Sequence, residues 1–242
     1  MGASSGIGMA LCRVLIERGW NVGVAARRGD KLEDIKATAP QAVHTMVADV
    51  TTDGAKECIA FFDKKLGSID LYVHVAGVGW QNMELDEEKE MRTVETNAMG
   101  FVRMVTAAYN HFAHRGVGHI AVVSSIAGTK GLGAAPAYSA TKAMQNVYIQ
   151  ALEQQAAMRG LDIRFTDIRP GFVATPLLGD GKGYPMLMDA DDVARRIADA
   201  IERRRHVCVI DGRYRLLVAL WRMLPAWLWR RLKVAGTGGK KA

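Results

Sequence analysis

Three glycines stand within seven residues near the start of the chain, in the run Gly2-Ala3-Ser4-Ser5-Gly6-Ile7-Gly8. The residues that follow, to about Arg18, have the spacing of an amphipathic helix. Its buried side is expected to hold Met9, Leu11, Cys12, Leu15 and Ile16. Glycines permit a tight turn, and free N–H groups at the start of a helix attract a pyrophosphate. A glycine run alone could be an ordinary loop, but ahead of an amphipathic helix and a valine-rich strand it predicts a dinucleotide site.

Apolar patterns of strand length alternate with helical patterns along the chain. Strands are expected at residues 21–26, 42–47, 71–76, 120–123, 162–168 and 207–210. Helices are expected at residues 52–66, 87–99, 101–113, 138–159 and 189–204. This alternation predicts an α/β fold with a doubly wound parallel sheet and helices on both faces. A chain of 242 residues with 49% hydrophobic content can form one sizeable core, so residues 1–212 are assigned to a single domain.

In a doubly wound sheet, a central apolar strand delivers the glycine turn at its carboxyl end. Here Met1 directly precedes the turn, so most of this first strand is missing from the expected fold. Its loss would leave the neighbouring strands with unpaired backbone groups, which cost free energy when they are buried. The expectation is therefore that the native protein has several more residues ahead of Met1.

A second motif joins a strand end to a helix. Ser125 follows the expected strand at residues 120–123, and Tyr138 and Lys142 lie four residues apart on the expected helix. Four residues make about one helical turn, so the phenol and the ammonium share a face and can reach one point. Each residue alone has an ordinary structural explanation, as a strand cap or a residue on a helix surface. Their occurrence together with the glycine run favours a common site.

The order and spacing of these motifs resemble the short-chain dehydrogenase/reductase family, over residues 1 to about 212. Besides the glycine run and the set of Ser125, Tyr138 and Lys142, the resemblance rests on Asp49 in Ala48-Asp49-Val50, Asn97 in Thr96-Asn97-Ala98-Met99-Gly100, and Pro170-Gly171 with Thr175. It implies a Rossmann-like fold and an oxidoreductase that uses a nicotinamide dinucleotide and no metal. It also implies a catalytic set made of Asn97, Ser125, Tyr138 and Lys142.

The resemblance further implies which residues contact the cofactor. These residues are Gly2, Ser4, Ser5, Gly6, Ile7, Gly8, Asp49, Val50, Ala76, Gly77, Tyr138, Lys142, Pro170, Gly171, Val173 and Thr175. Asp49 is expected at the adenine amino group, and the Val173 backbone and Thr175 hydroxyl at the nicotinamide amide and the phosphate. Lys142 is expected to bind the nicotinamide ribose hydroxyls. The segment 176–188, which is rich in glycine and methionine, is expected to form a lid over the substrate.

Two positions leave alternatives open. His74-Val75-Ala76-Gly77 stands where the family usually has Asn-Asn-Ala-Gly, which removes amide hydrogen bonds that tie the centre of the sheet to its neighbours. His74 is a tempting catalytic candidate, but a lone histidine in an apolar strand is more often a core residue with its hydrogen bonds satisfied. Asn97 could simply satisfy local backbone groups, whereas the family pattern implies that it holds a water linking a helix carbonyl to Lys142.

The end of the strand at residues 21–26 bears on the choice of cofactor. A site specific for NAD(H) has a carboxylate here for the ribose 2′-hydroxyl, but this chain has Ala25-Ala26-Arg27-Arg28. NADP(H) is therefore favoured over NAD(H). Arg27 is the better candidate for the 2′-phosphate, because a guanidinium binds phosphate oxygens in pairs, and Ser4 could add a hydroxyl. The alternative is a solvated arginine pair in a turn.

The expected chemistry is hydride transfer to a ketone, which places negative charge on the ketone oxygen. Tyr138 is expected to donate the proton, and Ser125, rather than Ser124, to donate the orienting hydrogen bond. In the oxidative direction Tyr138 acts as a base, and lowering its pKa from about 10 to 7 requires roughly 4 kcal/mol. An ammonium about 4 Å away supplies about that much at an effective dielectric near 20, so Lys142 is expected to suffice.

The net charge of +7 is concentrated at the carboxyl end of the chain. Residues 213–242 hold eight Lys and Arg and no Asp or Glu, which leaves 24 basic and 25 acidic residues in the rest. A nearly neutral body argues against nucleic-acid binding. Residues 213–235 are expected to form a basic amphipathic extension interrupted near Pro225. Its apolar face could pack over the substrate cleft or a second subunit, or lie on an anionic membrane surface. Residues 236–242 are expected to be disordered.

The remaining features favour a cytoplasmic protein, peripheral at most to a membrane. No signal peptide precedes the glycine run, and the longest apolar runs are too short to span a bilayer. Cys12, Cys58 and Cys208 lack metal spacing and are expected to be reduced thiols. The expected function is an NADP(H)-dependent carbonyl reductase or alcohol dehydrogenase, homo-oligomeric and acting on a hydrophobic substrate. The alternative is a dinucleotide-binding regulator or membrane-associated interaction protein without turnover.

Overall fold

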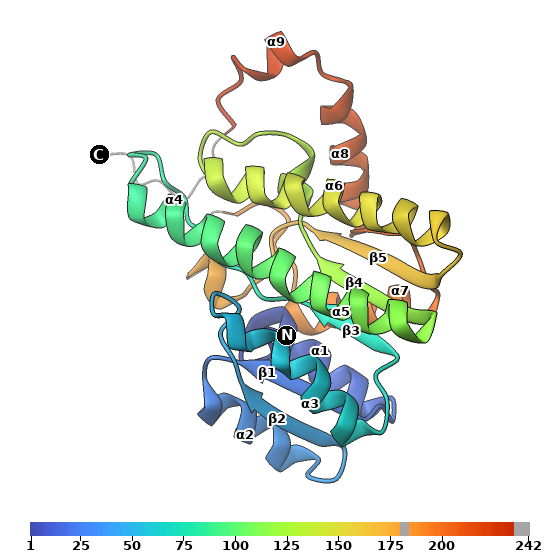
Figure 1. Cartoon of the computed structure of the whole chain (residues 1–242). Coiled ribbons are helices and arrows are strands. Elements are labelled where there is room, and N and C mark those ends of the chain that lie inside the picture. The colour runs from blue at the N-terminus through green and yellow to red at the C-terminus, as the bar shows by residue number, and fades with distance from the viewer. Residues whose placement is uncertain (180–183, 235–242) are drawn as a thin grey trace.

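The computed structural model describes residues 1–179 and 184–234, and in this part of the chain parallel strands form a middle layer. The strands are β1 (Val22–Ala26), β2 (Val43–Val47), β3 (Leu71–His74), β4 (Val117–Val123), β5 (Asp162–Pro170) and β6 (Val207–Ile210). Figure 1 shows helices on both faces of this layer. The predicted α/β fold with a parallel Rossmann-like sheet is therefore confirmed.

Apart from the helix at residues 29–38, which we did not predict, the helices follow the predicted order. They are α1 (Gly6–Glu17), α2 (Gly29–Thr38), α3 (Glu57–Leu66), α4 (Glu87–Val94), α5 (Phe101–Arg115), α6 (Pro136–Met158), α7 (Ala190–Glu202), α8 (Gly212–Met223) and α9 (Ala226–Trp229). Helices α1 and α7 contribute to a core on one face of the sheet, and α3, α5 and α6 to a core on the other. Alternate residues of β4 belong to opposite cores, with Ala121 and Val123 in the first and Ile120 and Val122 in the second. Burial on both faces explains why this strand is apolar throughout.

The strand layer is divided into two sheets. One contains β1 and β2, and the other has the order β3-β4-β5-β6. Met1 and Gly2 lie between β1 and β3: the Met1 terminal amine donates to the Val73 carbonyl at 2.9 Å, and the Gly2 N–H donates to the Ala25 carbonyl at 2.8 Å. A cavity of about 290 Å³ lies between β1 and β3 and is also lined by residues of α1 and α3. The break falls where a central strand was expected ahead of the glycine turn.

The chain between residues 87 and 115 corrects one expectation. We predicted two separate helices, but α4 and α5 are joined through a π-helical turn at Glu95–Gly100 into one continuous helix. Gly100 keeps helical angles, and a Cβ there would lie 2.7 Å from the Val50 side chain, so this glycine allows close packing and does not end the helix. π-helical turns are frequent at functional sites, and this one contains Asn97.

The carboxyl-terminal segment packs on the body of the protein. In Figure 1, α8 leads away from the strand layer to α9 at the top of the view, and Pro225 separates the two helices. The Trp221 indole N–H donates to the Thr129 hydroxyl at 2.9 Å, and the Trp229 indole N–H donates to the Gly131 carbonyl at 2.8 Å. The structure thus shows the packing alternative for Trp221 and Trp229, whereas Leu216, Leu220 and Trp227 of the same segment are exposed. The tail expected to be disordered, residues 236–242, lies outside the described residues.

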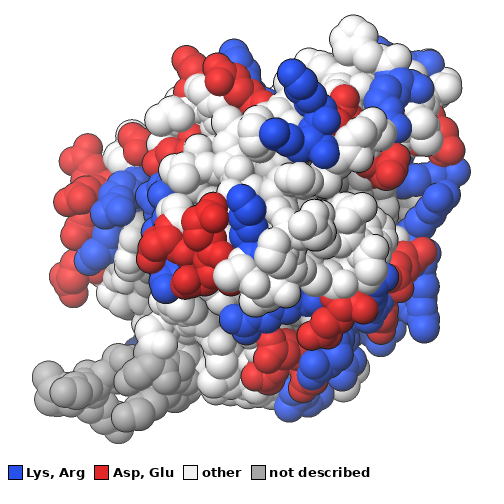
Figure 2. Space-filling view, turned by 90° about the horizontal axis from the view of Figure 1, so that it is seen from below, with Lys and Arg blue, Asp and Glu red and all other residues white. Residues whose placement is uncertain are grey.

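The surface charge agrees with the neutral body expected from the sequence. Acidic and basic side chains are interspersed over the face shown in Figure 2. Among the described helices, none combines the length and apolar character needed to cross a bilayer. All three cysteines are free thiols, of which Cys58 is buried.

Candidate active site

A cavity of about 770 Å³ lies at the carboxyl ends of β1, β3, β4 and β5. It brings together nearly the whole set of candidate residues chosen from the sequence. Those that line it are Gly2, Ser4, Ser5, Gly6, Ile7, Gly8, Arg27, Asp49, Val50, Ala76, Gly77, Ser125, Tyr138, Lys142, Pro170, Gly171, Val173 and Thr175. Asn97 is fully buried behind this lining.

The glycine turn is compact because its backbone approaches itself closely. Gly2 and Gly6 have positive φ angles of +92° and +53°, and a Cβ on Gly8 would lie 2.1 Å from the Gly2 carbonyl oxygen. Only glycine fits such positions without strain. Ser5 is the N-cap of α1, and the first turn of this helix carries no acidic side chain. The free N–H groups and the positive end of the helix dipole therefore face the cavity without a competing carboxylate.

Arg28 lies across the glycine turn. Its guanidinium donates to the Ser4 hydroxyl at 3.0 Å and to the Ser5 hydroxyl at 2.7 Å. Arg27, the residue that the sequence favours for a phosphate, also lines the cavity, and its charge lowers the pKa of Asp49. The hydrogen bonds of Arg28 to the glycine turn make it a second candidate for the same role.

Asp49 is held as a hydrogen-bond acceptor. The Thr51 N–H and hydroxyl donate to one carboxylate oxygen at 2.9 Å and 2.8 Å. Burial raises the pKa of the Asp49 carboxyl. The hydrogen bonds from Thr51 and the nearby charge of Arg27 together lower it by more, so the pKa lies below its usual value. The carboxylate is therefore ionised at neutral pH and can accept from an amino group.

Ser125 and Tyr138 meet in the cavity from separate elements. Ser125 follows the end of β4 and accepts the Ala127 N–H at 3.0 Å, which fixes its hydroxyl. Tyr138 stands in the first turn of α6, and a Cβ on Gly79 would lie 2.4 Å from its ring, so the loop after β3 packs tightly on the phenol. Burial raises the pKa of Tyr138, while a hydrogen bond with Ser125 opposes this rise.

The raised pKa of Tyr138 corrects the expectation that Lys142 would lower it. The Lys142 ammonium lies 5.7 Å from the centre of the Tyr138 ring. It donates to the Val123 carbonyl at 3.0 Å and to Gln145 Oε1 at 3.1 Å. Burial lowers the pKa of Lys142 to about 8, and the charge of Asp167 partly offsets this effect.

Asn97 connects the π-helical turn to the loop after β3 and, through Gln145, to the lysine. The Asn97 side chain exchanges hydrogen bonds with the Val78 backbone, donating at 2.7 Å and accepting at 2.8 Å. Its backbone carbonyl accepts from Gln145 Nε2 at 2.8 Å, and Gln145 in turn accepts from Lys142. The Gln145 side chain therefore links this helix carbonyl to the lysine. Gln145 was missed in the sequence, although it stands three residues after Lys142 on the same helix face.

Two competing candidates make other contacts. The Ser124 hydroxyl is committed to the Asp167 carboxylate and the Ile168 carbonyl. His74 does not line the cavity: it is fully buried, bonded through Nδ1 to the Tyr72 hydroxyl at 2.8 Å, and packed edge-on against Phe101. Burial lowers the pKa of His74 well below its usual value, so it stays neutral. These contacts support Ser125 over Ser124 and a core position for His74.

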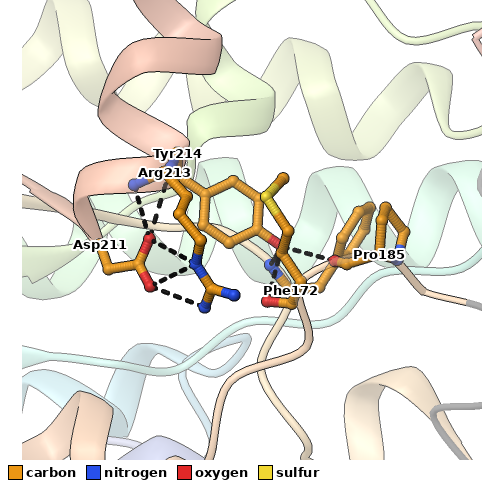
Figure 3. Close-up of polar contacts among 6 residues, drawn as sticks. Phe172, Pro185, Asp211, Arg213 and Tyr214 are labelled. Atoms are coloured by element: carbon orange, nitrogen blue, oxygen red, sulfur yellow. Dashed lines mark hydrogen bonds and ion pairs between the residues drawn. The ribbon is translucent and has the colours of Figure 1, made fainter.

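Tyr214, in the carboxyl-terminal segment, is a further residue that the sequence analysis did not single out. Its hydroxyl accepts the Phe172 N–H at 3.1 Å and donates to the Pro185 carbonyl at 2.9 Å (Figure 3). It thereby joins the loop after β5 to the described part of the predicted lid. Asp211 caps α8 by accepting the N–H groups of Arg213 and Tyr214, which fixes the start of this helix.

The comparisons with known proteins agree with this geometry. A family model described as short chain dehydrogenase matches residues 1–182. The chain is 34% identical over 209 residues to an uncharacterized oxidoreductase of Myxococcus xanthus, covering 84% of this chain and 82% of that protein. It is also 34% identical over 227 residues to the glycine betaine reductase ATRR of Emericella nidulans, covering 86% of this chain but only 18% of that protein's length.

Solved structures extend the similarity to the fold. An X-ray structure of an alcohol dehydrogenase from the archaeon Thermococcus sibiricus, complexed with 5-hydroxy-NADP, matches with a TM-score of 0.76 and 26% identity. The match covers 86% of this chain and 92% of that one. The extent of the family match and the identity to full-length relatives show that this chain belongs to the short-chain dehydrogenase family of oxidoreductases.

Proposed function

We propose that this protein is an NADP(H)-dependent oxidoreductase that interconverts a carbonyl and a secondary alcohol on a hydrophobic substrate. The observation that carries the proposal is that Ser125, Tyr138 and Lys142 line the same cavity as the glycine turn. A proton donor, a hydrogen-bond donor and a cation beside a dinucleotide site are the groups that carbonyl reduction requires. The 5-hydroxy-NADP in the related Thermococcus sibiricus structure supports a nicotinamide cofactor.

The residues present fit a dinucleotide. A Cβ at Gly2 would lie 2.5 Å from the Ala76 backbone nitrogen, and one at Gly77 would lie 3.2 Å from the Asn97 side chain, so glycine at both positions allows the close packing that shapes this part of the cavity lining. In the proposal, the N-terminus of α1 holds the pyrophosphate, Asp49 the adenine amino group, and Val173 with Thr175 the nicotinamide end. When bound, the nicotinamide supplies or accepts the hydride.

Side chains of the protein donate the proton and orient the carbonyl oxygen. Because burial raises the pKa of Tyr138, the phenol stays protonated at neutral pH and can donate to the carbonyl oxygen. The Ser125 hydroxyl, held from one side by Ala127, donates a hydrogen bond to the same oxygen and orients it. Lys142 keeps positive charge beside the site, and Gln145 and Asn97 position its ammonium.

The pKa of Lys142 predicts the alkaline side of the pH profile. Since this pKa is lowered to about 8, the ammonium is present below about pH 8 and is lost above it, and kcat/KM should fall with it. The Asp167 carboxylate raises this pKa, so Asp167→Asn should move the alkaline limb to lower pH. The measurement is kcat/KM for ketone reduction against pH. Asp162→Asn is the matched control, because Asp162 is exposed on the same strand. A limb that stays in place in Asp167→Asn would show that Lys142 does not titrate there.

The preference for NADP(H) predicts a role for Arg28. We expect Arg28→Ala to raise the KM for NADPH about 10- to 100-fold and the KM for NADH by less than about threefold, because hydrogen bonds to charged groups contribute roughly 1.5–3 kcal/mol. Arg27→Ala is the matched variant, and initial rates with each cofactor are the measurement. A larger NADPH effect in Arg27→Ala would return the phosphate role to Arg27. Equal effects on the two cofactors in both variants would contradict the preference.

The test of the proposed function is NADPH oxidation against a panel of apolar ketones and aldehydes. Consumption of NADPH with formation of the alcohol is the expected result. Tight NADPH binding without turnover of any member would favour the alternative of a dinucleotide-binding protein without catalysis.

A further inference from the structure

We propose that Trp221 and Trp229 form a fixed apolar wall of the substrate site and make the enzyme select elongated, uncharged substrates over small ones. This inference rests on the proposed function and goes beyond it, because it names the selecting residues and the shape of the substrate. It also assigns a task to the carboxyl-terminal segment, which contributes none of the candidate catalytic or cofactor-binding residues.

The cavity extends from the candidate catalytic residues to the carboxyl-terminal segment. We call its apolar end the part lined by Leu132, Phe172, Tyr184, Leu217, Trp221 and Trp229. The described residues that line this end carry no formal charge. The charged residues in the lining, Arg27, Arg28, Asp49 and Lys142, belong to the proposed cofactor side and the lysine network. Burying a charged group against an apolar wall without a partner is costly, so this end favours an apolar chain.

Hydrogen bonds hold the wall to the loop that precedes the catalytic helix. The Trp221 indole N–H donates to the Thr129 hydroxyl, and the Trp229 indole N–H donates to the Gly131 carbonyl. Lys130, between these two partners, donates to the Leu224 carbonyl at 3.0 Å. This loop connects Ser125 to Tyr138. The wall is therefore fixed relative to the two groups that would hold the carbonyl oxygen.

Aromatic contacts stiffen the wall further. The Trp221 and Trp229 rings meet edge to face with centroids 5.6 Å apart, and the Lys130 ammonium lies 5.6 Å from the centre of the Trp229 ring. A wall made of two mutually packed indoles presents apolar surface in a defined position, which allows it to discriminate by length.

Two other loops also line the apolar end. Phe172 and Tyr184 pack with ring centroids 4.7 Å apart, and the Tyr184 hydroxyl accepts from Gln81 at 3.0 Å. Tyr214, at the base of α8, ties the backbone of both segments together. The apolar end is thus enclosed by three separate parts of the chain. A long substrate would contact all three, whereas a small ketone would contact only the catalytic end.

The experiment compares a long and a short ketone. We expect the ratio of kcat/KM for 2-decanone to that for 2-butanone to fall roughly 10-fold or more in the double variant Trp221→Ala/Trp229→Ala, because lost apolar contacts are worth about 1–3 kcal/mol in substrate discrimination. Trp227→Ala is the matched control, since Trp227 lies on the same segment, is 60% exposed and does not line the cavity. Its ratio should stay within about twofold of the unaltered protein.

Two further measurements keep the outcome clear. Trp221→Phe keeps an aromatic ring but loses part of the apolar surface and the bond to Thr129, so its ratio should fall by less than that of the double variant. Circular dichroism checks that each variant is folded. Calorimetric binding of 2-decanol, which needs no turnover, should weaken in the double variant and not in Trp227→Ala. A ratio and a 2-decanol affinity that the double variant leaves unchanged would overturn the inference. The unaltered protein could bind 2-decanol through these tryptophans and yet oxidise NADPH with neither ketone. That result would contradict the proposed function and still support Trp221 and Trp229 as the apolar wall.

Discussion

Tyr138→Phe is expected to reduce kcat for ketone reduction at least about 10³-fold, while NADPH binding changes little. Positioned proton transfer contributes about 10²–10⁴-fold to such reactions, and phenylalanine removes only the donating hydroxyl. The ring itself should stay in place, because it is held by the loop at Gly79 and by the first turn of α6. Rates under saturating substrate and NADPH fluorescence titrations are the measurements.

Ser125→Ala provides the comparison for this variant. It should also lower kcat, but less than Tyr138→Phe, because it removes an orienting hydrogen bond and leaves the proton donor. Turnover retained in Tyr138→Phe would refute the assignment of the proton donor. A loss of NADPH affinity as large as the loss of kcat would instead point to a binding role for the phenol.

Gly8→Ala is expected to weaken NADPH binding about 10- to 100-fold. A Cβ at this position would lie 2.1 Å from the Gly2 carbonyl oxygen, so the turn must open and its N–H groups must move from the dinucleotide position. Overpacking of this kind costs about 1–3 kcal/mol, and each 1.4 kcal/mol is tenfold in affinity. NADPH titration together with the thermal unfolding midpoint separates lost affinity from lost stability.

Gly54→Ala is the matched control for the glycine turn. A Cβ on Gly54 would meet no atom within 4 Å, and this glycine does not line the cavity. Its affinity for NADPH should equal that of the unaltered protein. Unchanged affinity in Gly8→Ala as well would mean that the turn does not bind the dinucleotide.

Much of the fold could be predicted because its signals are local. The apolar run before Ser125 and the helical spacing after Tyr138 fix the period of each element, and the alternation of elements predicts the parallel sheet. Local signals also explain the error at Gly100, because a glycine between two helical patterns resembles the end of a helix. Its close packing on Val50 is a tertiary contact that only the folded chain displays.

The candidate site was predictable in its membership but not in its connections. The glycine turn, Ser125, Tyr138 and Lys142 are recognisable by type and spacing. The raised pKa of Tyr138 was not, because it depends on how deeply the folded chain buries the phenol. Tyr214 lies far along the chain from the loops that it joins, so no local pattern could place it at the site.

Transfer of deuterium from NADPH deuterated at the nicotinamide C4 position tests the central claim most directly. The reaction uses the best ketone of the panel, and mass spectrometry of the alcohol product is the readout. With one of the two C4 epimers, we predict one deuterium on the carbinol carbon for the unaltered protein, and about a thousandth as much product in the same time for Tyr138→Phe. Alcohol without deuterium from either C4 epimer, or equal labelled product from both proteins, would contradict hydride transfer at a site built on Ser125, Tyr138 and Lys142.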